Sequence, residues 1–399
     1  MTSRERVLKT LKHQIPDKVP IDFGGMGSTG IMAIAYNQLK KHLGMDLKTT
    51  RICDVNQQLA EPEKEILDLF EVDVISLHHS LGKNNEDWIN WNLPDGSPAK
   101  IHKKMMPAKE GENWVIKDGE KIRFKMVPNC LYFESCNPPL ESAASEKEIN
   151  NYHWKYFTDE YLKELESRAK WLFEITEYAI LGGFGGNILE EGQVLRGWSN
   201  FMIDLVANQD FTEALLDKLV EVYLRNLEGF LQAVSKYIQI IQMGDDLGTQ
   251  NGPQISLELY QKMIKPRHKK VYQFVKENSD LYLFLHSCGS IYDFIPDLID
   301  CGVDILNPVQ FTAAKMDSKK LKEEFGDKIT FWGGGVDTQK ILPFGTPAEI
   351  EKQVEEQLKI FGKNGGYVFN SVHNIQSNIP VENILALFDS AKKYRNYNY

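Results

Sequence analysis

Short apolar runs that end in small or polar residues recur along this chain, with helix-like segments between them. Eight such runs span residues 19–25, 73–79, 178–184, 238–246, 281–286, 303–307, 329–334 and 367–373. Segments in which apolar residues recur at steps of three and four lie at 211–224, 291–301, 347–361 and 381–394. Apolar strands that alternate with helices predict a parallel sheet covered on both faces, and eight units favour a (β/α)8 TIM barrel.

An open doubly wound sheet is the alternative α/β fold. That fold usually carries a glycine-rich fingerprint after its first strand, and the glycines of residues 24–29 match it poorly. A second glycine cluster at 182–187 follows another strand without an acidic residue at the required distance, so we interpret it as a tight loop. The expected fold is therefore a single barrel domain over residues 1–399.

Residues 82–150 interrupt the strand–helix rhythm. Asp-Gly turns at 95–96 and 118–119 lie between alternating segments, which predicts antiparallel hairpins. We interpret this stretch as a β-hairpin insertion after the second strand that packs as a small layer or lid over the barrel mouth. Residues 1–18 are expected to form a leading helix that plugs or flanks the bottom of the barrel.

The charge and cysteine content exclude several classes of protein. The net charge is −10 and no basic run occurs, so binding to nucleic acid is not expected. No apolar run reaches membrane-spanning length, and the charged N-terminal segment does not resemble a signal peptide. The five cysteines are odd in number and scattered without the spacing of a disulfide framework. These features predict a reduced cytoplasmic protein.

Polar residues that can bind metals or substrates follow the last five strands. They are Asp245, Asp246 and Gln250 after the fourth strand, His286 and Cys288 at the fifth, Asn307 and Gln310 at the sixth, Asp337 at the seventh, and His373 and Gln376 at the eighth. The carboxyl ends of all barrel strands meet at one mouth, where active sites of this fold lie. We therefore expect these side chains to converge.

The pair His286 and Cys288 predicts a metal site. Side chains two residues apart on extended backbone point the same way, and zinc binds both imidazole nitrogen and thiolate sulfur. His373, on the strand beside the first, could supply a third ligand from across the mouth. A fourth position could be filled by Asp245, Asp246 or one of the glutamates at 190–191, or stay open for a substrate.

Structural roles are the alternatives for the same residues. An isolated His-x-Cys is more often a buried histidine beside an inert cysteine, and His373 could be a loop histidine capped by Asn374 or Gln376. Asp245 and Asp246 could cap the following turn, and Asp337 could be a helix N-cap. The remaining cysteines are interpreted as packing residues.

Taken together, five motifs resemble the uroporphyrinogen decarboxylase superfamily, and more narrowly its cobamide-dependent methyltransferase branch. The motifs are Gly-Asp-Asp-Leu-Gly-Thr-Gln at 244–250, His-Ser-Cys-Gly at 286–289, Asn-Pro-Val-Gln at 307–310, Gly-Gly-Gly-Val-Asp at 333–337 and Val-His-Asn-Ile-Gln at 372–376. The likeness covers most of the chain and is strongest from residue 240 onward. The resemblance implies one (β/α)8 barrel, and family members often form homodimers.

Two reactions compete within this family. Its decarboxylases hold an acidic tetrapyrrole with an N-terminal arginine-rich loop and a central aspartate and use no metal. The corresponding loop here, residues 22–30, contains no arginine, and an acidic substrate needs cations to hold it. The methyltransferases instead bind zinc on a His-x-Cys pair and a later ligand, usually cysteine. His286 and Cys288 match that pair, whereas His373 stands where the cysteine falls.

The resemblance therefore implies a zinc-dependent methyltransferase that moves a methyl group between a corrinoid and a small thiol, ether or alcohol. Its expected metal ligands are His286, Cys288 and His373, and Asp245 or Asp246 would orient substrate or act as general base. The expected substrate contacts are Gln250, Asn307, Gln310, Asp337 and Gln376. The chain lacks an Asp-x-His-x-x-Gly segment, so a separate protein is expected to carry the corrinoid.

Two further hypotheses stay open. One is a metal-free decarboxylase or lyase that acts on a carboxylate, with Asp245 as the central acid. The other is a barrel that binds a corrinoid or tetrapyrrole without turning it over. A measurement of bound metal separates the zinc-dependent methyltransferase from both of these hypotheses.

Overall fold

Seven parallel strands form the central sheet of the protein. The computed structural model describes residues 1–82 and 86–396. The strands are β4 (Val74–Ser76), β11 (Ala179–Gly185), β12 (Ile240–Gly244), β13 (Tyr282–His286), β14 (Ile305–Asn307), β15 (Thr330–Trp332) and β16 (Tyr367–Val368), in the order β16-β15-β14-β13-β12-β11-β4. Residues 83–85 and 397–399 of the expected insertion and domain lie outside the described residues.

The two edges of this sheet are joined by residues of the predicted first strand. Ile21 bridges Phe369, directly after β16, and Asp22 bridges Val74 of β4, so the ring closes in a TIM-barrel-like arrangement. The expectation of a full strand over 19–25 is wrong. Pro20 has no N–H to donate, and the Asp22 carboxylate accepts from the Gly25 N–H at 2.9 Å, which turns the chain out of the ladder. The other seven strands lie where they were predicted.

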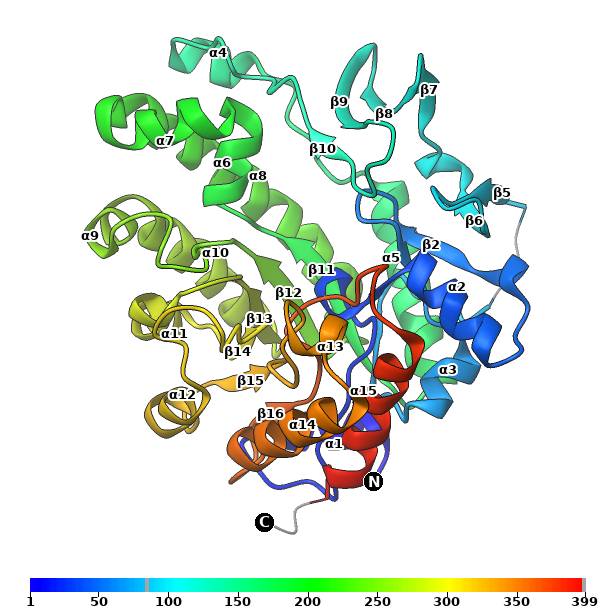
Figure 1. Cartoon of the computed structure of the whole chain (residues 1–399). Helices are drawn as coiled ribbons and strands as arrows, with labels where there is room; N and C mark the ends of the chain where they lie inside the picture. Colours follow the sequence, from blue (N-terminus) through cyan, green and yellow to red (C-terminus); the bar gives the residue numbers. More distant parts are fainter. Residues whose placement is uncertain (83–85, 397–399) are drawn as a thin grey trace.

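Helices lie around the outer side of the ring and, in the case of the first one, across its bottom (Figure 1). They are α1 (Ser3–Leu11), α2 (Ala33–His42), α3 (Lys64–Leu69), α4 (Glu146–Asn151), α5 (Asp159–Ile175), α6 (Leu189–Arg196), α7 (Trp198–Ala207), α8 (Gln209–Val234), α9 (Leu257–Leu259), α10 (Lys265–Asn278), α11 (Ile295–Cys301), α12 (Ser318–Phe325), α13 (Ile341–Phe344), α14 (Pro347–Phe361) and α15 (Val381–Tyr394). The predicted helices over 347–361 and 381–394 are confirmed to the residue. In the described part of the chain, no helix combines the length and apolar character that a membrane crossing requires.

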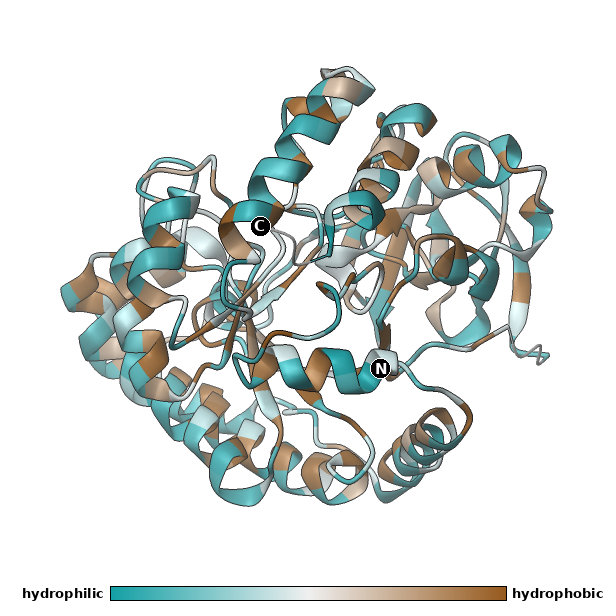
Figure 2. Cartoon of the chain, turned by 90° about the horizontal axis from the view of Figure 1, so that it is seen from below, coloured by the Kyte–Doolittle hydropathy of each residue, from teal (hydrophilic) through white to brown (hydrophobic). Residues whose placement is uncertain are grey.

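The helix α1 closes the bottom of the ring. Its Val7 and Leu11 are buried against side chains that point into the barrel from every strand of the parallel sheet: Val74, Ala179, Leu181, Ile240, Phe284, Ile305, Trp332 and Val368. Seen from below, α1 starts at the N-terminus and lies across this end of the molecule (Figure 2). The interior is therefore a packed core, as barrel geometry requires, and the sequence-based expectation of a leading helix that plugs the bottom is confirmed.

Two smaller sheets lie beside the ring. One contains β1 (Ile31–Met32), β2 (Arg51–Asp54), β3 (Leu59–Ala60), β5 (Trp88–Asn92) and β6 (Pro98–His102); the other contains β7 (Ala108–Glu110), β8 (Asn113–Asp118), β9 (Lys121–Met126) and β10 (Glu134–Ser135). Antiparallel pairs β5–β6 and β8–β9 occupy the stretch between β4 and β11. The sequence-based prediction missed β1, β2 and β3, which are short and lack a clear alternation of polar and apolar residues.

The glycine cluster at 182–187 differs from its prediction. We expected a tight loop, but β11 continues to Gly185, with an irregularity in its pairing between Gly183 and Gly185. A Cβ atom on Gly182 would lie 2.7 Å from the Ile238 side chain, so glycine lets this strand lie close to its neighbour. Close packing explains Gly182, whereas Gly185 and Gly186 have φ values of +97° and +71° and lead into the loop that follows the strand, so the prediction is wrong for the first half of the cluster only.

Candidate metal centre

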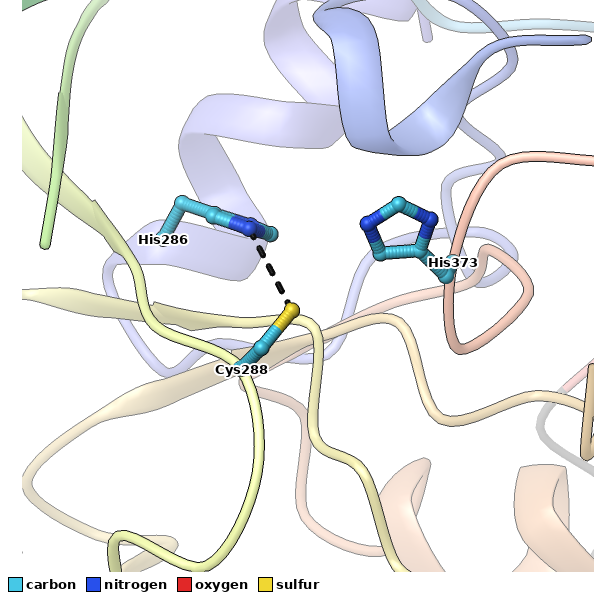
Figure 3. Close-up of side chains that lie close together, drawn as sticks. All are labelled: His286, Cys288 and His373. Carbon is cyan, nitrogen blue, oxygen red and sulfur yellow. Dashed lines mark hydrogen bonds between the residues drawn. The ribbon is translucent and has the colours of Figure 1, made fainter. Parts of the chain in front are cut away.

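His286, Cys288 and His373 converge at the mouth of the ring (Figure 3). One ligand atom from each lies within 4.8 Å of the other two. The Cys288 Sγ lies 3.5 Å from His286 Nε2, and the two imidazole rings lie 6.1 Å apart between centroids. The fold thus brings together the three residues predicted as metal ligands, although His286 and His373 are 87 positions apart in the sequence.

The parallel sheet explains this convergence. His286 is the last residue of β13, and Cys288 follows in the turn that starts the next loop. His373 lies in the loop after β16, whose strand is separated from β13 by β14 and β15. Because the carboxyl ends of parallel strands all open on the same side of the ring, residues just beyond these two strands meet there.

The donor set fits zinc. A zinc–nitrogen bond of about 2.0 Å and a zinc–sulfur bond of about 2.3 Å at the tetrahedral angle place the two ligand atoms about 3.5 Å apart. The Cys288 Sγ and His286 Nε2 atoms lie 3.5 Å apart. Burial raises the pKa of the Cys288 thiol, and a hydrogen bond with His373 opposes that rise. A cation at this point would favour the thiolate form of Cys288.

Both histidines are oriented by an asparagine. Asn307 donates from Nδ2 to the Trp332 carbonyl at 2.9 Å, so its Oδ1 accepts from His286 Nδ1 at 2.7 Å. In the same way, Asn374 Oδ1 accepts from His373 Nδ1 at 3.0 Å. With the proton on Nδ1, each ring keeps the lone pair of Nε2 for a metal.

Asn307 therefore does not act as predicted. We expected it to contact a substrate, but its side chain is fully buried and is used by Trp332, His286 and Ser28. The expectation failed because a polar residue at a strand end can face the neighbouring strand instead of the mouth. Its role is to position His286.

Asp245 and Asp246 point to different places. Asp245 is fully buried; it accepts from the Leu189 and Glu190 N–H groups at 2.9 Å each, and one oxygen lies 2.9 Å from His268 Nε2. This carboxylate has no surface for a substrate, so the structure moves it from the predicted catalytic role to a structural one. His268, on α10, was missed because nothing distinguishes it from other helix residues in the sequence.

Asp246 remains at the metal centre. Its Oδ1 accepts from the Cys288 N–H at 2.8 Å and lies 3.7 Å from His286 Nε2, and a third of its side chain is exposed. Next to it, Glu190 accepts from the Asp246 N–H at 2.8 Å and from Asn187 Nδ2 at 2.6 Å. Burial and the two neighbouring aspartates raise the pKa of Glu190 to about 7.

Three of the other predicted substrate contacts line one pocket, and the fourth lies next to it. A pocket of about 320 Å³ beside Cys288 and His373 is lined by Gln310, Asp337 and Gln376. Gln250 lies outside this lining; its amide donates to the Thr312 carbonyl at 2.6 Å and accepts from Gln310 at 2.7 Å. Both polar groups of Gln250 thus hold neighbouring loops, and its contact with a substrate stays a prediction.

Gln310 and Gln376 also brace the site, whereas the carboxylate of Asp337 bonds within its own loop. Gln310 Oε1 accepts from the Gly289 N–H at 2.9 Å, next to Cys288. Asp337 accepts from the Gln339 N–H at 2.8 Å. Gln376 donates to Asn374 and accepts from the Tyr132 hydroxyl, which comes from the segment between β9 and β10.

A TIM-barrel-like ring with a cluster of His and Cys at its mouth is typical of a metal-dependent enzyme. Comparison with known proteins gives the family. The model of the uroporphyrinogen decarboxylase (URO-D) family matches residues 186–394, just over half of the chain, and the chain belongs to this family.

Individual relatives are more distant. The uroporphyrinogen decarboxylase of Actinobacillus succinogenes is 24% identical over 223 residues, which cover 53% of this chain and 58% of the relative. That of Carboxydothermus hydrogenoformans is 24% identical over 229 residues, 57% of each protein. The match thus spans less than two thirds of these relatives.

A solved structure resembles the whole chain. It is a methyltransferase from Methanosarcina mazei with a TM-score of 0.61, 19% sequence identity and coverage of 99% of both chains. At this identity the likeness establishes the fold.

Proposed function

We propose that this protein is a zinc-dependent methyltransferase that moves a methyl group between a corrinoid, carried by a separate protein, and a small thiol, ether or alcohol. His286, Cys288 and His373 would hold the zinc. The observation that carries the proposal is the convergence of their ligand atoms within 4.8 Å. The full-length likeness to a methyltransferase of the same fold supports it.

When bound, zinc supplies a Lewis acid that lowers the pKa of an acceptor thiol or hydroxyl. The residues of the chain provide the rest. Asn307 and Asn374 hold the Nδ1 side of both histidines. With zinc on the two Nε2 atoms, the thiolate of Cys288 would be the one negatively charged ligand of the set. A ligand set with one thiolate leaves zinc more electrophilic than a set with two. Such a zinc ion would bind an alkoxide or an ether oxygen of the small molecule as well as a thiolate.

Asp246 is the residue best placed to handle the proton that the acceptor releases. Its carboxylate is partly exposed and lies 3.7 Å from His286 Nε2. As a thiol or alcohol gained the methyl carbon, the cobalt–carbon bond of the corrinoid co-substrate would break with its electron pair left on cobalt, and the proton of the acceptor would pass to the Asp246 carboxylate. The pocket lined by Gln310, Asp337 and Gln376 would hold the remainder of the small molecule.

A metal-free decarboxylase is the second candidate, because the curated relatives carry that name. The site provides fewer of the groups that such a decarboxylase would need. Asp245, the expected central acid, is buried and hydrogen-bonded on both oxygens, and the loop over 22–30 has no arginine for an acidic substrate.

The test is the zinc content of the purified full chain, followed by methyl transfer from methylcobalamin to a panel of thiols and alcohols. We expect about one zinc per chain, lost in both Cys288→Ala and His373→Ala. Cys130→Ala and His153→Ala are matched controls, since both residues are exposed outside the mouth. A native protein without zinc would overturn the proposal, and zinc lost with Cys288 alone would remove His373 from the ligand set.

A further inference from the structure

A second cavity lies outside the metal centre. It has a volume of about 420 Å³ and is bounded by α6, α8, the end of β11 and the sheet that contains β8 and β9. Its lining includes neither Cys288 nor the two histidines. Ligand pockets commonly measure about 300–1,000 Å³, so the size suits a small organic molecule.

Aromatic rings form much of its wall. Tyr152 and Trp154 meet edge to face with centroids 5.1 Å apart, and Phe184 meets Tyr223 at 6.0 Å. Phe124 adds a further ring from β9. The face of an aromatic ring carries partial negative charge, so a cavity lined by several rings attracts an organic cation with apolar substituents.

The charged groups of the cavity are unevenly paired. Asp118 lies 3.4 Å from Lys155 Nζ and 3.9 Å from Arg123 Nε, and Arg123 also donates to the Asn137 carbonyl at 2.7 Å. The charges of Asp118, Lys155 and Arg123 are therefore paired with one another. Glu191, in the first turn of α6, also lines the cavity, and among the described residues no hydrogen bond or ion pair is formed by its carboxylate.

Glu191 is thus a half-buried carboxylate without a counter-ion in contact. Burial raises its pKa, while the charge of Lys155 acts in the opposite direction. Lys155 already contacts Asp118, and its side chain is mostly exposed. A carboxylate removed from water gains most from a cation that enters the cavity beside it.

We propose that this cavity binds a small organic cation, a substituted or quaternary ammonium, with Glu191 as its counter-ion and the rings of Tyr152, Trp154 and Phe184 as its apolar walls. Glu190 and Glu191 then serve different sites from adjacent positions: Glu190 bonds to Asp246 at the metal centre, and Glu191 faces the second cavity. The cation site does not depend on the proposed methyl transfer.

Calorimetric titration of the full chain with choline tests the proposal. The neutral isostere 3,3-dimethylbutan-1-ol and the anion benzoate are titrated in parallel at constant ionic strength. We expect choline to bind at least tenfold more tightly than the neutral isostere, because only choline gains from the carboxylate and the ring faces. Equal binding of the two, tighter binding of benzoate, or no binding of choline would each overturn the proposal.

Variants locate the site. Glu191→Gln should weaken choline binding at least tenfold, whereas Glu166→Gln, the same change on an exposed position of α5, should not. Tyr152→Leu keeps Glu191 intact and should weaken choline more than the neutral isostere, which guards against a Glu191 variant that fails to fold. Cys288→Ala should bind choline as tightly as the wild type, because Cys288 does not line this cavity. The choline titration therefore gives the same result whether or not the proposed zinc site is correct. Choline binding that survives both Glu191→Gln and Tyr152→Leu would place the ligand elsewhere.

Discussion

The two ends of the barrel use buried polar groups in opposite ways. At the bottom, Asp73 is fully buried, and its oxygens accept from Arg6 Nη1 at 2.6 Å, Arg395 Nη2 at 2.7 Å, the Ser3 hydroxyl at 2.7 Å and the Ile21 N–H at 2.9 Å. Every acceptor position of that carboxylate is used. The network ties both ends of the described chain to the ring.

At the mouth, the polar groups are held on one side only. Asn307 and Asn374 fix the Nδ1 side of the two histidines and leave both Nε2 atoms directed towards Cys288. A polar network in which every hydrogen-bonding position is used stabilises the fold. A network that leaves one side of each histidine unused keeps the Nε2 lone pairs available for a metal ion. The comparison predicts that variants at the mouth change metal binding and variants at the bottom change stability.

The largest expected effect belongs to His286→Ala. Loss of a ligand should remove the bound zinc and lower the rate of methyl transfer by roughly 10³-fold, since a catalytic metal contributes several kcal/mol. The free energy of unfolding of the metal-free protein should fall by only about 1 kcal/mol, the value of one hydrogen bond. Elemental analysis, transfer assays and urea melts of metal-free protein measure the three quantities. A large loss of metal-free stability would contradict the contrast between the two ends.

Asp73→Asn should have the reverse profile. Two buried arginines would lose their shared anion, which typically costs about 3–5 kcal/mol of unfolding free energy. The zinc content of the folded protein should not change, because the metal centre lies at the other end of the ring. Asp389→Asn is the matched control; its carboxylate forms an exposed ion pair with Lys392 at 3.0 Å, and its urea midpoint should equal that of the wild type. An unchanged midpoint for Asp73→Asn would refute the role of the bottom network.

The ring and part of the metal centre could be predicted from the sequence, but the orientation of individual polar side chains could not. The apolar strands and their order predicted the ring, because strands buried on both faces leave a continuous apolar signal. The spacing of His286 and Cys288 predicted that two ligands leave one strand together. Sequence could not reveal that Asp245 faces Leu189 and His268, since a strand end does not show which way its side chains turn.

Pairing between distant segments was also beyond the sequence. The ion network of Asp73 with Arg6 and Arg395 joins residues more than 300 positions apart, and no local pattern marks such partners. Strands β1, β2 and β3 of one small sheet were missed for a related reason, because strands of two to four residues leave too little alternation to detect.

The asparagines sharpen the comparison at the mouth. Asn307→Ala and Asn374→Ala should each weaken zinc binding by roughly 10–100-fold, because the histidines lose the partner that fixes their tautomer. Asn370→Ala is the control; Asn370 is also buried near the end of β16, but its amide donates to the carbonyls of Asp22 and Thr29 and accepts from the Ser371 hydroxyl. Competition with a chelator measures the affinity. If Asn370→Ala weakens zinc equally, general loosening of the mouth, and not the tautomer, is the cause.

The smallest expected effect concerns the contact between the antiparallel segment and the mouth. The hydroxyl of Tyr132, just before β10, donates to Gln376, which in turn donates to Asn374 beside His373. Tyr132→Phe removes this hydroxyl and keeps the ring, so the zinc content and the melting temperature should stay at wild-type values. If the segment helps to hold a small molecule in the pocket, KM for the acceptor should rise about threefold to tenfold, the equivalent of one hydrogen bond, with kcat unchanged. Tyr161→Phe, a half-buried tyrosine on α5 away from the pocket, should leave KM unchanged. A fall in kcat with constant KM would instead mean that Tyr132 acts through His373 on the metal centre and not through the pocket.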